Sequence, residues 1–363
     1  MANNTQNNAL ILLNKDEPAI SETFISSHIR ELGAPYINIY KHSLIGREIT
    51  LSLSKTFLSH YYRRRKSTHA VGKLIEENDI KVLLAEYGHV GADAVALSRH
   101  FGLPLIIHFH GHEAYRSTVL KDYKRKYEEA FVHAKAIIGV SKDMCRQLIA
   151  LGAPKDKVHY NSYGVDLKSF QCLPREKHRK TLLFVGRFVD KKAPHLVLLS
   201  FKKILEKHAD AKLNMIGDGY LFNSCKSLAR SLKIYDSVNF LGPLEHSNVI
   251  HHYLAANVFI QHSITAEDND KEGTPNSILE AGASCLPVVS TRHAGITDVI
   301  IENETGLLVD EGDVDKMAYH VNTLFDDPEM GIRMGVKARR VIEEKFSLTQ
   351  SIGGLKRIIQ SSV

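Results

Sequence analysis

Short apolar runs alternate with segments of helical periodicity along almost the whole chain. The apolar runs have the length of buried strands, and the segments between them carry apolar residues three or four positions apart. This alternation predicts parallel sheets with helices on both faces. The predicted strands are residues 9–13, 82–85, 105–109, 136–140, 181–186, 213–217, 238–242, 258–262 and 287–291, and the clearest predicted helices are residues 67–78, 91–101, 193–208 and 221–233.

The alternation occurs twice, before and after a polar stretch at residues 171–180 that contains a proline and a cluster of basic residues. A chain of 363 residues is too long for one compact core, so we expect two domains. We therefore predict an α/β fold of two Rossmann-like domains, residues 1–170 and residues 171–345, that face each other across a cleft. The last part of the chain is predicted to be helical, with a break at residues 345–347.

The composition, 44% hydrophobic and 24% charged, is typical of a soluble globular protein. No apolar run reaches the roughly 18–20 residues that a membrane-spanning helix needs. The first residues have neither the basic head nor the apolar stretch of a signal peptide. We therefore expect a cytoplasmic protein.

Neither the cysteines nor the histidines have the spacing of a metal site. Cys145, Cys172, Cys225 and Cys285 are scattered, which predicts free thiols in a reducing cytosol. The 20 histidines show no ligand pattern, and we predict no metal.

The net charge of +6 lies entirely in the first half of the chain. Residues 1–170 contain 23 Lys and Arg against 17 Asp and Glu, and the remaining residues contain 24 of each. The excess favours an anionic partner, but the sequence has no Trp and no zinc-finger spacing, so we do not expect nucleic acid. Basic runs with interleaved tyrosines at residues 61–66 and 121–126 suggest peripheral contact with an anionic membrane. Solvated helix faces are the alternative interpretation.

The segment GRFVDKKAP (186–194) follows a predicted strand, where ligands bind in doubly wound sheets. Gly186 permits a tight turn close to a ligand, and Arg187 and Lys192 add two cations before a helix that begins near Pro194. This combination suits a diphosphate. A solvated basic loop is the alternative.

The segment EGTPNSILEA (272–281) also follows a predicted strand and a polar, acidic loop. Glu272 and Glu280 are eight positions apart, slightly more than two helical turns, so we expect them to share a helix face. The residues between them resemble a helix start with free backbone N–H groups, which bind phosphate or sugar oxygens. An amphipathic helix with ordinary exposed glutamates is the alternative.

Together these two segments resemble the retaining glycosyltransferases of family 4, which have the GT-B fold. Further segments fall where that family places such motifs, and the similarity runs the length of the chain. They are SETFISSHIREL (21–32), AEYGHVGADAVALSRHFGLPLIIHFHGHEAY (85–115), GVSKDM (139–144), YGVD (163–166), IGDG (216–219), FLG (240–242), LPVVSTRHAGITDVI (286–300) and TGLLV (305–309).

The resemblance assigns roles in the second half of the chain. Arg187 and Lys192 match the pair that neutralises the donor diphosphate as it leaves. Glu280 matches the carboxylate that binds the nucleotide ribose, and Glu272 matches the one beside the transferred sugar. The backbone of one short segment is expected to contact sugar and phosphate oxygens: Gly273, Thr274, Pro275, Asn276 and Ser277.

In the first half, His110 matches the histidine that contacts the donor sugar. His108 and His112 lie on the same side of the predicted strand, so the choice among the three depends on the family. The sequence departs from the family pattern in its first loop, residues 14–23, which lacks the usual glycine pair. The resemblance also implies that the last helix, residues 346–363, packs back on the first domain.

The expected reaction is transfer of a hexosyl unit from a nucleoside diphosphate sugar to an acceptor hydroxyl, with retention and without a metal or other cofactor. A carbohydrate or lipid-linked acceptor in polysaccharide or glycolipid synthesis is expected by association with the family. The alternatives are a non-hydrolysing sugar-nucleotide epimerase and a non-catalytic sugar-nucleotide-binding protein.

Overall fold

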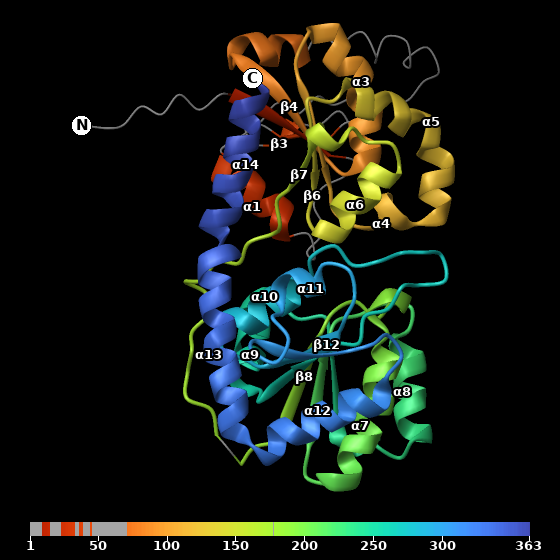
Figure 1. Ribbon diagram of the computed structural model, residues 1–363, viewed down its shortest axis with the longest axis vertical. Helices are drawn as coiled ribbons and strands as arrows, with labels where there is room; N and C mark the ends of the chain where they lie inside the picture. Colours follow the sequence, from red (N-terminus) through yellow and green to blue (C-terminus); the bar gives the residue numbers. More distant parts are fainter. Residues whose placement is uncertain (1–8, 15–22, 33–35, 39–43, 46–70, 177) are drawn as a thin grey trace, which may run out of the picture.

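The computed structural model shows two α/β halves stacked along the long axis, with two long helices running beside both (Figure 1). It describes residues 9–14, 23–32, 36–38, 44–45, 71–176 and 178–363. The basic run at residues 61–66, the start of the helix predicted at residue 67 and most of the first loop lie outside the described residues.

The first sheet has seven strands in the order β3-β2-β1-β4-β5-β6-β7. Neighbouring strands are parallel except at one edge, where β3 runs antiparallel to β2, unlike the all-parallel sheet expected from the sequence. The strands are β1 (Ala9–Asn14), β2 (Tyr36–Asn38), β3 (Leu44–Ile45), β4 (Ile80–Glu86), β5 (Leu105–Phe109), β6 (Ala136–Gly139) and β7 (Val158–Tyr160).

The second sheet has six parallel strands in the order β10-β9-β8-β11-β12-β13. All nine strands predicted from the sequence are present in the two sheets, because strands buried on both faces form continuous apolar runs. Four short strands were not predicted, namely β2, β3, β7 and β13. The strands of the second sheet are β8 (Thr181–Val185), β9 (Lys212–Ile216), β10 (Val238–Gly242), β11 (Val258–Ile260), β12 (Val288–Thr291) and β13 (Gly306–Val309).

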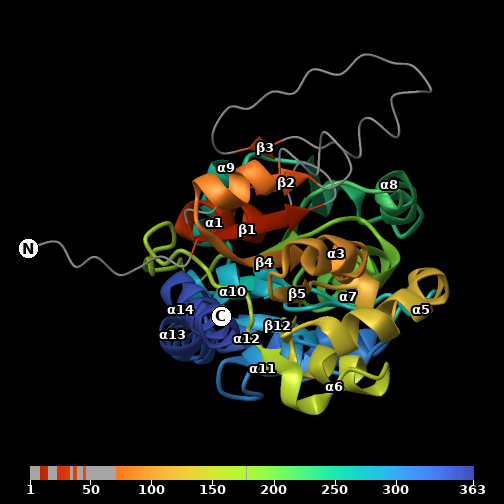
Figure 2. The ribbon, with the colours of Figure 1, turned by 90° about the horizontal axis from the view of Figure 1, so that it is seen from above.

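Helices connect the parallel strands in both halves and cover the sheets (Figures 1 and 2). In the first half they are α1 (Thr23–Leu32), residues 71–77, α3 (Gly88–Phe101), α4 (His112–Tyr115), α5 (Ser117–His133) and α6 (Lys142–Ala150). In the second half and after it they are α7 (Pro194–Lys207), α8 (Phe222–Ser231), α9 (His246–Ala255), α10 (Asn276–Ala283), α11 (Ile296–Val299), α12 (Val314–Asp326), α13 (Pro328–Lys345) and α14 (Leu348–Ser362). Among the described residues, no helix has the length and apolar character needed to cross a membrane.

The last two helices cross from the second half to the first. Ser347 separates them, and its hydroxyl accepts a hydrogen bond from the backbone N–H of Gln350 at 3.3 Å, a typical N-cap. Backbone hydrogen bonds join this break to the first half, from Val165 to the carbonyl of Phe346 and from Leu348 to the carbonyl of Val165, both at 2.9 Å. One side of α14 is buried against α1 and the first sheet in a cluster that contains Ile25, Val82, Ile106, Ile138, Ile352, Leu355 and Ile359.

A polar cavity of about 500 Å³ opens where the two halves meet. Lys142 and Tyr160 line it from the first half, and Asp298 and Glu344 line it from the second. None of the predicted site residues is among its lining residues.

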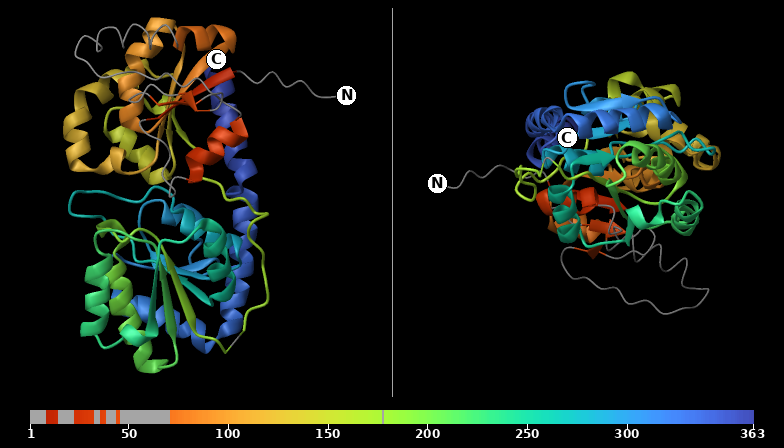
Figure 3. Two further views of the ribbon diagram at one scale, coloured as in Figure 1. Left: turned by 180° about the vertical axis from the view of Figure 1, so that it is seen from behind. Right: turned by 90° about the horizontal axis from the view of Figure 1, so that it is seen from below.

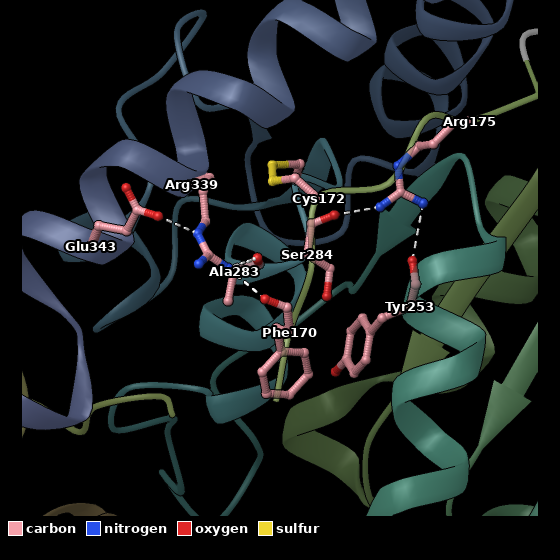
Figure 4. The surroundings of a disulfide bond; sticks show 9 residues. Phe170, Cys172, Arg175, Tyr253, Ala283, Ser284, Arg339 and Glu343 are labelled. Atoms are coloured by element: carbon pink, nitrogen blue, oxygen red, sulfur yellow. Dashed lines mark hydrogen bonds and ion pairs between the residues drawn. A yellow bond between two sulfur atoms is a disulfide. The ribbon is translucent and has the colours of Figure 1, made fainter. Parts of the chain in front are cut away.

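The expectation of four free thiols is wrong for two of them. Cys172 and Cys285 form a disulfide, with Cα atoms 5.2 Å apart, whereas Cys145 and Cys225 are free (Figure 4). The two partners are 113 residues apart, so spacing along the chain gave no sign of the pair. They meet because the segment that connects the halves passes the end of α10.

The same connecting segment runs along the outside of the second half (Figure 3), and two arginines bind it there (Figure 4). Arg175 donates to the carbonyls of Tyr253 at 3.0 Å and Ser284 at 2.5 Å. Arg339 on α13 donates to the carbonyl of Phe170 at 2.8 Å. The connection between the halves is therefore attached to the helices that it passes.

We expect Leu355→Ala to destabilise the protein by roughly 2–5 kcal/mol, because Leu355 is fully buried between α14 and the first sheet. Urea denaturation followed by circular dichroism measures this effect. The matched control is Lys356→Ala on the exposed side of the same helix. Equal midpoints for the two variants would contradict the role of α14 in holding the first half.

Candidate active site

The loop after β8 turns tightly because glycines allow two backbone segments to approach closely. Gly217, with a φ of 127°, follows β9, and a Cβ atom there would lie 2.1 Å from the carbonyl oxygen of Gly186. Arg187, the residue after Gly186, is exposed, and no carboxylate of the described residues pairs with it. Helix α7 begins at Pro194, as predicted.

Lys192 and Glu272 form a buried ion pair, with 3.3 Å between Nζ and Oε2. Burial lowers the pKa of Lys192, and the charge of Glu272 opposes that shift. Burial by itself would raise the pKa of Glu272, but the charges of Lys192, Lys191 and His293 lower it. The second oxygen, Oε1, is buried and has no hydrogen-bond partner among the described residues.

Asp270, in the loop after β11, links the loop after β8 to the first half of the molecule. Its Oδ1 accepts a hydrogen bond from Lys191 at 3.0 Å, and its Oδ2 accepts one from Arg116, between α4 and α5, at 3.2 Å. Arg116 also pairs with Asp268 at 2.8 Å. The N–H of Ser117, the first residue of α5, donates to the carbonyl of Asp268 at 2.8 Å. The acidic loop after β11 therefore joins the two halves beside the predicted diphosphate site.

The segment before α10 packs directly against the first half. A Cβ atom at Gly273 would lie 2.5 Å from the carbonyl oxygen of His110, so a side chain there would separate the two backbones. The hydroxyl of Thr274 donates to the carbonyl of Val140 at 2.5 Å. This bond commits the Thr274 side chain to the first half.

The expectation that Glu272 and Glu280 share a helix face is wrong. Pro275 is the extended N-cap, and α10 begins at Asn276, so Glu272 precedes the helix and only Glu280 lies on it. Proline favours this because its ring fixes φ at a helix start and restricts the residue before it to extended backbone.

Glu280 is held by two side chains of α9. His246 Nε2 lies 3.0 Å from Oε1, and the hydroxyl of Tyr253 donates to Oε2 at 2.9 Å. The hydrogen bond with Glu280 raises the pKa of His246. One turn earlier on α10, the hydroxyl of Ser277 donates to Oε1 of Gln261 at 2.9 Å, so its side chain is also committed within the protein.

His110 follows β5, and its side chain is buried with both ring nitrogens bonded. Nε2 lies 2.7 Å from Glu86 Oε2, and Nδ1 lies 2.8 Å from the hydroxyl of Tyr163. Its backbone N–H donates to Glu113 Oε1 at 2.5 Å. Both the ring and the backbone of His110 are therefore fixed by carboxylates.

The two neighbouring histidines differ from His110 in exposure and bonding. His108 is buried, and its Nδ1 lies 3.4 Å from Glu86 Oε2, a weak contact, whereas Nε2 has no hydrogen-bond partner among the described residues. Burial, together with the charge of His110, lowers the pKa of His108 to about 4. The side chain of His112, the first residue of α4, is 39% exposed and lies 3.6 Å from Glu113.

Behind His110, the side chains of His28, Glu86 and His108 form a buried group with ligand atoms within 4.8 Å of one another. Such a group could hold a metal ion, which the sequence did not indicate because its members are far apart in the chain. The contact between His28 Nδ1 and Glu86 Oε1 is 2.7 Å, however. Two ligands of one tetrahedral zinc ion stand about 3.3 Å apart, so this contact has the length of a hydrogen bond.

Two family models match the chain in succession. The model described as "Glycosyltransferase Family 4" matches residues 43–169, and the model described as "Glycosyl transferases group 1" matches residues 166–341. The chain belongs to glycosyltransferase family 4. The predicted family and enzyme class are confirmed, and enzymes of this family use nucleotide sugars, retain the anomeric configuration and do not depend on a metal.

Curated relatives of this family 4 chain are named for the synthesis of bacterial polysaccharides and glycolipids. An amylovoran biosynthesis glycosyltransferase of Erwinia amylovora is 27% identical over 270 residues, 73% of this chain and 66% of the relative. A putative colanic acid biosynthesis glycosyltransferase of Escherichia coli is 27% identical over 73% of this chain and 67% of its own length. The aligned part thus spans about two thirds of these relatives. A GDP-mannose-dependent phosphatidylinositol monomannoside mannosyltransferase of Corynebacterium glutamicum is 27% identical over 81% of this chain and 80% of its own.

Solved structures confirm the GT-B fold. Anabaena Alr3699/HepE in complex with UDP superposes with a TM-score of 0.77 at 14% identity, over 97% of this chain and 100% of that one. A glycosyltransferase from Rickettsia africae superposes with a TM-score of 0.76 at 18% identity, over 98% of this chain and 100% of that one.

The structure of this family 4 chain brings some of the predicted site residues together and leaves others apart. The structure brings Lys192 into contact with Glu272 and sets Gly273 against His110, but no hydrogen bond or ion pair joins Arg187 to them. The missed residues are those that hold the predicted ones in place: Glu86, Arg116, Tyr163, Lys191, His246, Tyr253, Asp270 and His293. Glu86, Tyr163, Lys191 and His293 lie within segments that carry the family resemblance, whereas the other four lie in none of those segments.

Proposed function

We propose that this family 4 enzyme transfers a hexosyl unit from a nucleoside diphosphate sugar to a carbohydrate or lipid-linked acceptor hydroxyl, with retention, in polysaccharide or glycolipid synthesis. The observation that carries the proposal is the unpartnered Oε1 of Glu272, buried beside Lys192. A buried carboxylate oxygen without a donor costs about 1–3 kcal/mol or more. A hydroxyl of the transferred sugar supplies that donor.

The diphosphate is assigned to Arg187 and Lys192. Arg187 is exposed without a described carboxylate partner, and Lys192 pairs with a single described carboxylate, that of Glu272. Both lie just before the N-terminus of α7, and such termini favour anions. The backbone from Gly273 to Ser277, at the start of α10, adds N–H groups for sugar and phosphate oxygens.

Glu280 is assigned to the ribose and His110 to the donor sugar. A carboxylate suits a diol because its two oxygens accept hydrogen bonds side by side. His246 is half-exposed, so a ribose hydroxyl can replace its hydrogen bond to Glu280. His110 lies against Gly273 and therefore close to the sugar that Glu272 would hold.

In the proposed reaction, the acceptor hydroxyl attacks the anomeric carbon from the same face as the departing diphosphate. The acceptor oxygen bonds to the anomeric carbon, the bond to the donor phosphate breaks, and that phosphate takes the acceptor proton. Charge grows on the diphosphate, so preorganised cations contribute most of the stabilisation. Arg187 and Lys192 take this role, and no metal ion is required.

The acceptor is assigned to the first half, which we propose rests on an anionic membrane surface. Helix α5 exposes Lys121, Lys124 and Arg125, whereas Lys126 is paired with Asp93 at 2.6 Å. Cations near such a surface contribute about 1 kcal/mol each. A relative that acts on phosphatidylinositol monomannoside is consistent with a membrane acceptor.

Arg187→Ala and Lys192→Ala are each expected to lower turnover by roughly 10²–10³-fold, the usual effect of removing one preorganised group from a developing anion. Transfer to a saccharide acceptor, with a donor chosen by thermal-shift screening of UDP-, GDP- and ADP-sugars, measures the effect. Lys226→Ala on α8 is the control. Near-normal turnover in both site variants would remove the diphosphate assignment.

Glu280→Gln is expected to weaken binding of the free nucleotide roughly 10- to 100-fold, because it removes a charged hydrogen-bond acceptor from the ribose. Glu272→Gln should instead weaken binding of the nucleotide sugar and spare the free nucleotide. Isothermal titration calorimetry with both ligands separates the two variants, each serving as control for the other. The reverse pattern would exchange the two assignments.

Binding to anionic vesicles is expected to fall roughly 100-fold in a Lys121/Lys124/Arg125→Ser variant, because each cation near the surface contributes about 1 kcal/mol. Co-sedimentation at low salt measures binding, which should weaken as salt rises and be absent with neutral lipid. An Arg333/Lys337/Arg340→Ser variant on α13 is the control of equal charge. Equal binding to neutral vesicles, or none to anionic ones, would refute the proposed membrane contact.

A further inference from the structure

Glu86 is a fully buried carboxylate at the end of β4 that bonds to two histidines. His28 Nδ1 lies 2.7 Å from Oε1, and His110 Nε2 lies 2.7 Å from Oε2. Burial by itself would raise the pKa of Glu86, but the charge of His28 and hydrogen bonds from the surrounding histidines lower it well below its ordinary value. Glu86 is therefore ionised, and an ionised carboxylate only accepts hydrogen bonds.

The Glu86 carboxylate determines which ring nitrogen of His110 carries the proton. Because Glu86 cannot donate, the 2.7 Å contact requires a proton on Nε2 of His110. In the neutral ring Nδ1 then has a lone pair, which accepts from the hydroxyl of Tyr163 at 2.8 Å.

The hydroxyl of Tyr163 connects Nδ1 with the backbone of His110, and that backbone packs against the segment before α10. The Tyr163 hydroxyl that reaches Nδ1 also lies 3.4 Å from the carbonyl oxygen of His110. That same carbonyl oxygen packs against Gly273, next to Glu272. The opposite edge, with Nε2, points to Glu86 in the interior.

We propose that Glu86 is a positioning residue that holds His110 as its Nε2-protonated tautomer, so that Nδ1 accepts a hydrogen bond from a hydroxyl of the donor sugar in place of Tyr163. This inference rests on the proposed function, because it needs a sugar beside His110. Glu113 completes the arrangement, since its carboxylate accepts from the backbone N–H groups of His110 and Gly111 at 2.5 and 3.0 Å. The ring is thus held by one carboxylate and its backbone by another.

The direct test needs no variant. In protein labelled with ¹⁵N-histidine, the ring of His110, assigned by its loss in His110→Gln, should show a protonated Nε2 and an unprotonated Nδ1. A protonated Nδ1 in the wild-type protein would overturn the proposal. Stoichiometric zinc in the purified protein, lost in Glu86→Gln, would also overturn it, because Glu86 would then be a ligand.

The variant test uses Glu86→Gln, whose amide can donate to Nε2 and so permits the other tautomer. The ¹⁵N pattern of His110 should change, and turnover should fall roughly 10- to 100-fold with nucleotide affinity unchanged, since one oriented hydrogen bond is lost. Glu86→Asp keeps the charge and should retain the wild-type tautomer, and Glu76→Gln on the surface is the control. A changed tautomer with unchanged turnover would overturn the positioning role.

The tautomer and the activity report on different claims. The expected tautomer in a protein that transfers no sugar would refute the proposed function and leave the geometry of Glu86 and His110 intact. Transfer activity in a protein whose His110 carries its proton on Nδ1 would refute the inference and leave the proposed function intact.

Discussion

The buried ion pair between Lys192 and Glu272 sets how the loops after β8 and β11 lie against each other. Removing one partner of such a pair typically costs about 3–5 kcal/mol, because the other charge stays buried and unpaired. The backbone of Glu272 is held as well, since its N–H donates to Nε2 of His293 at 3.2 Å. His293 is in turn 2.6 Å from Glu311 through Nδ1. With its backbone and one oxygen fixed, Glu272 holds its other oxygen in a defined place, without a hydrogen-bond partner among the described residues.

Close backbone packing extends this arrangement into the first half. Gly273 lies against the carbonyl of His110, and Gly295 lies so close to Gly273 that a Cβ atom would be 2.0 Å from its carbonyl oxygen. Neither glycine has a φ in the left-handed range, so contact with neighbouring backbone, rather than conformation, excludes a side chain there. The salt bridges of Asp270 lie beside this contact. The two halves therefore meet closely at the point where the chemistry is proposed.

The chain crosses between the halves twice, and both crossings are anchored. The connecting segment is held by the Cys172–Cys285 disulfide and by Arg175 and Arg339. The second crossing, at Ser347, is held by backbone bonds to Val165 and by the apolar side of α14. Because the disulfide ends beside α10, the helix that carries Glu280 is attached to the connection between the halves.

The sequence by itself determined the alternating strands and helices, the doubled sheet, the break before α14 and the order of the basic and acidic motifs. These features depend on local periodicity and on residues close together in the chain, such as Arg187 and Lys192. Tertiary structure alone decided the pairing of Cys172 with Cys285 and the meeting of Glu86 with His28 and His110. Those outcomes depend on packing between residues tens of positions apart, and a local pattern of hydrophobic and polar residues carries no information about such contacts.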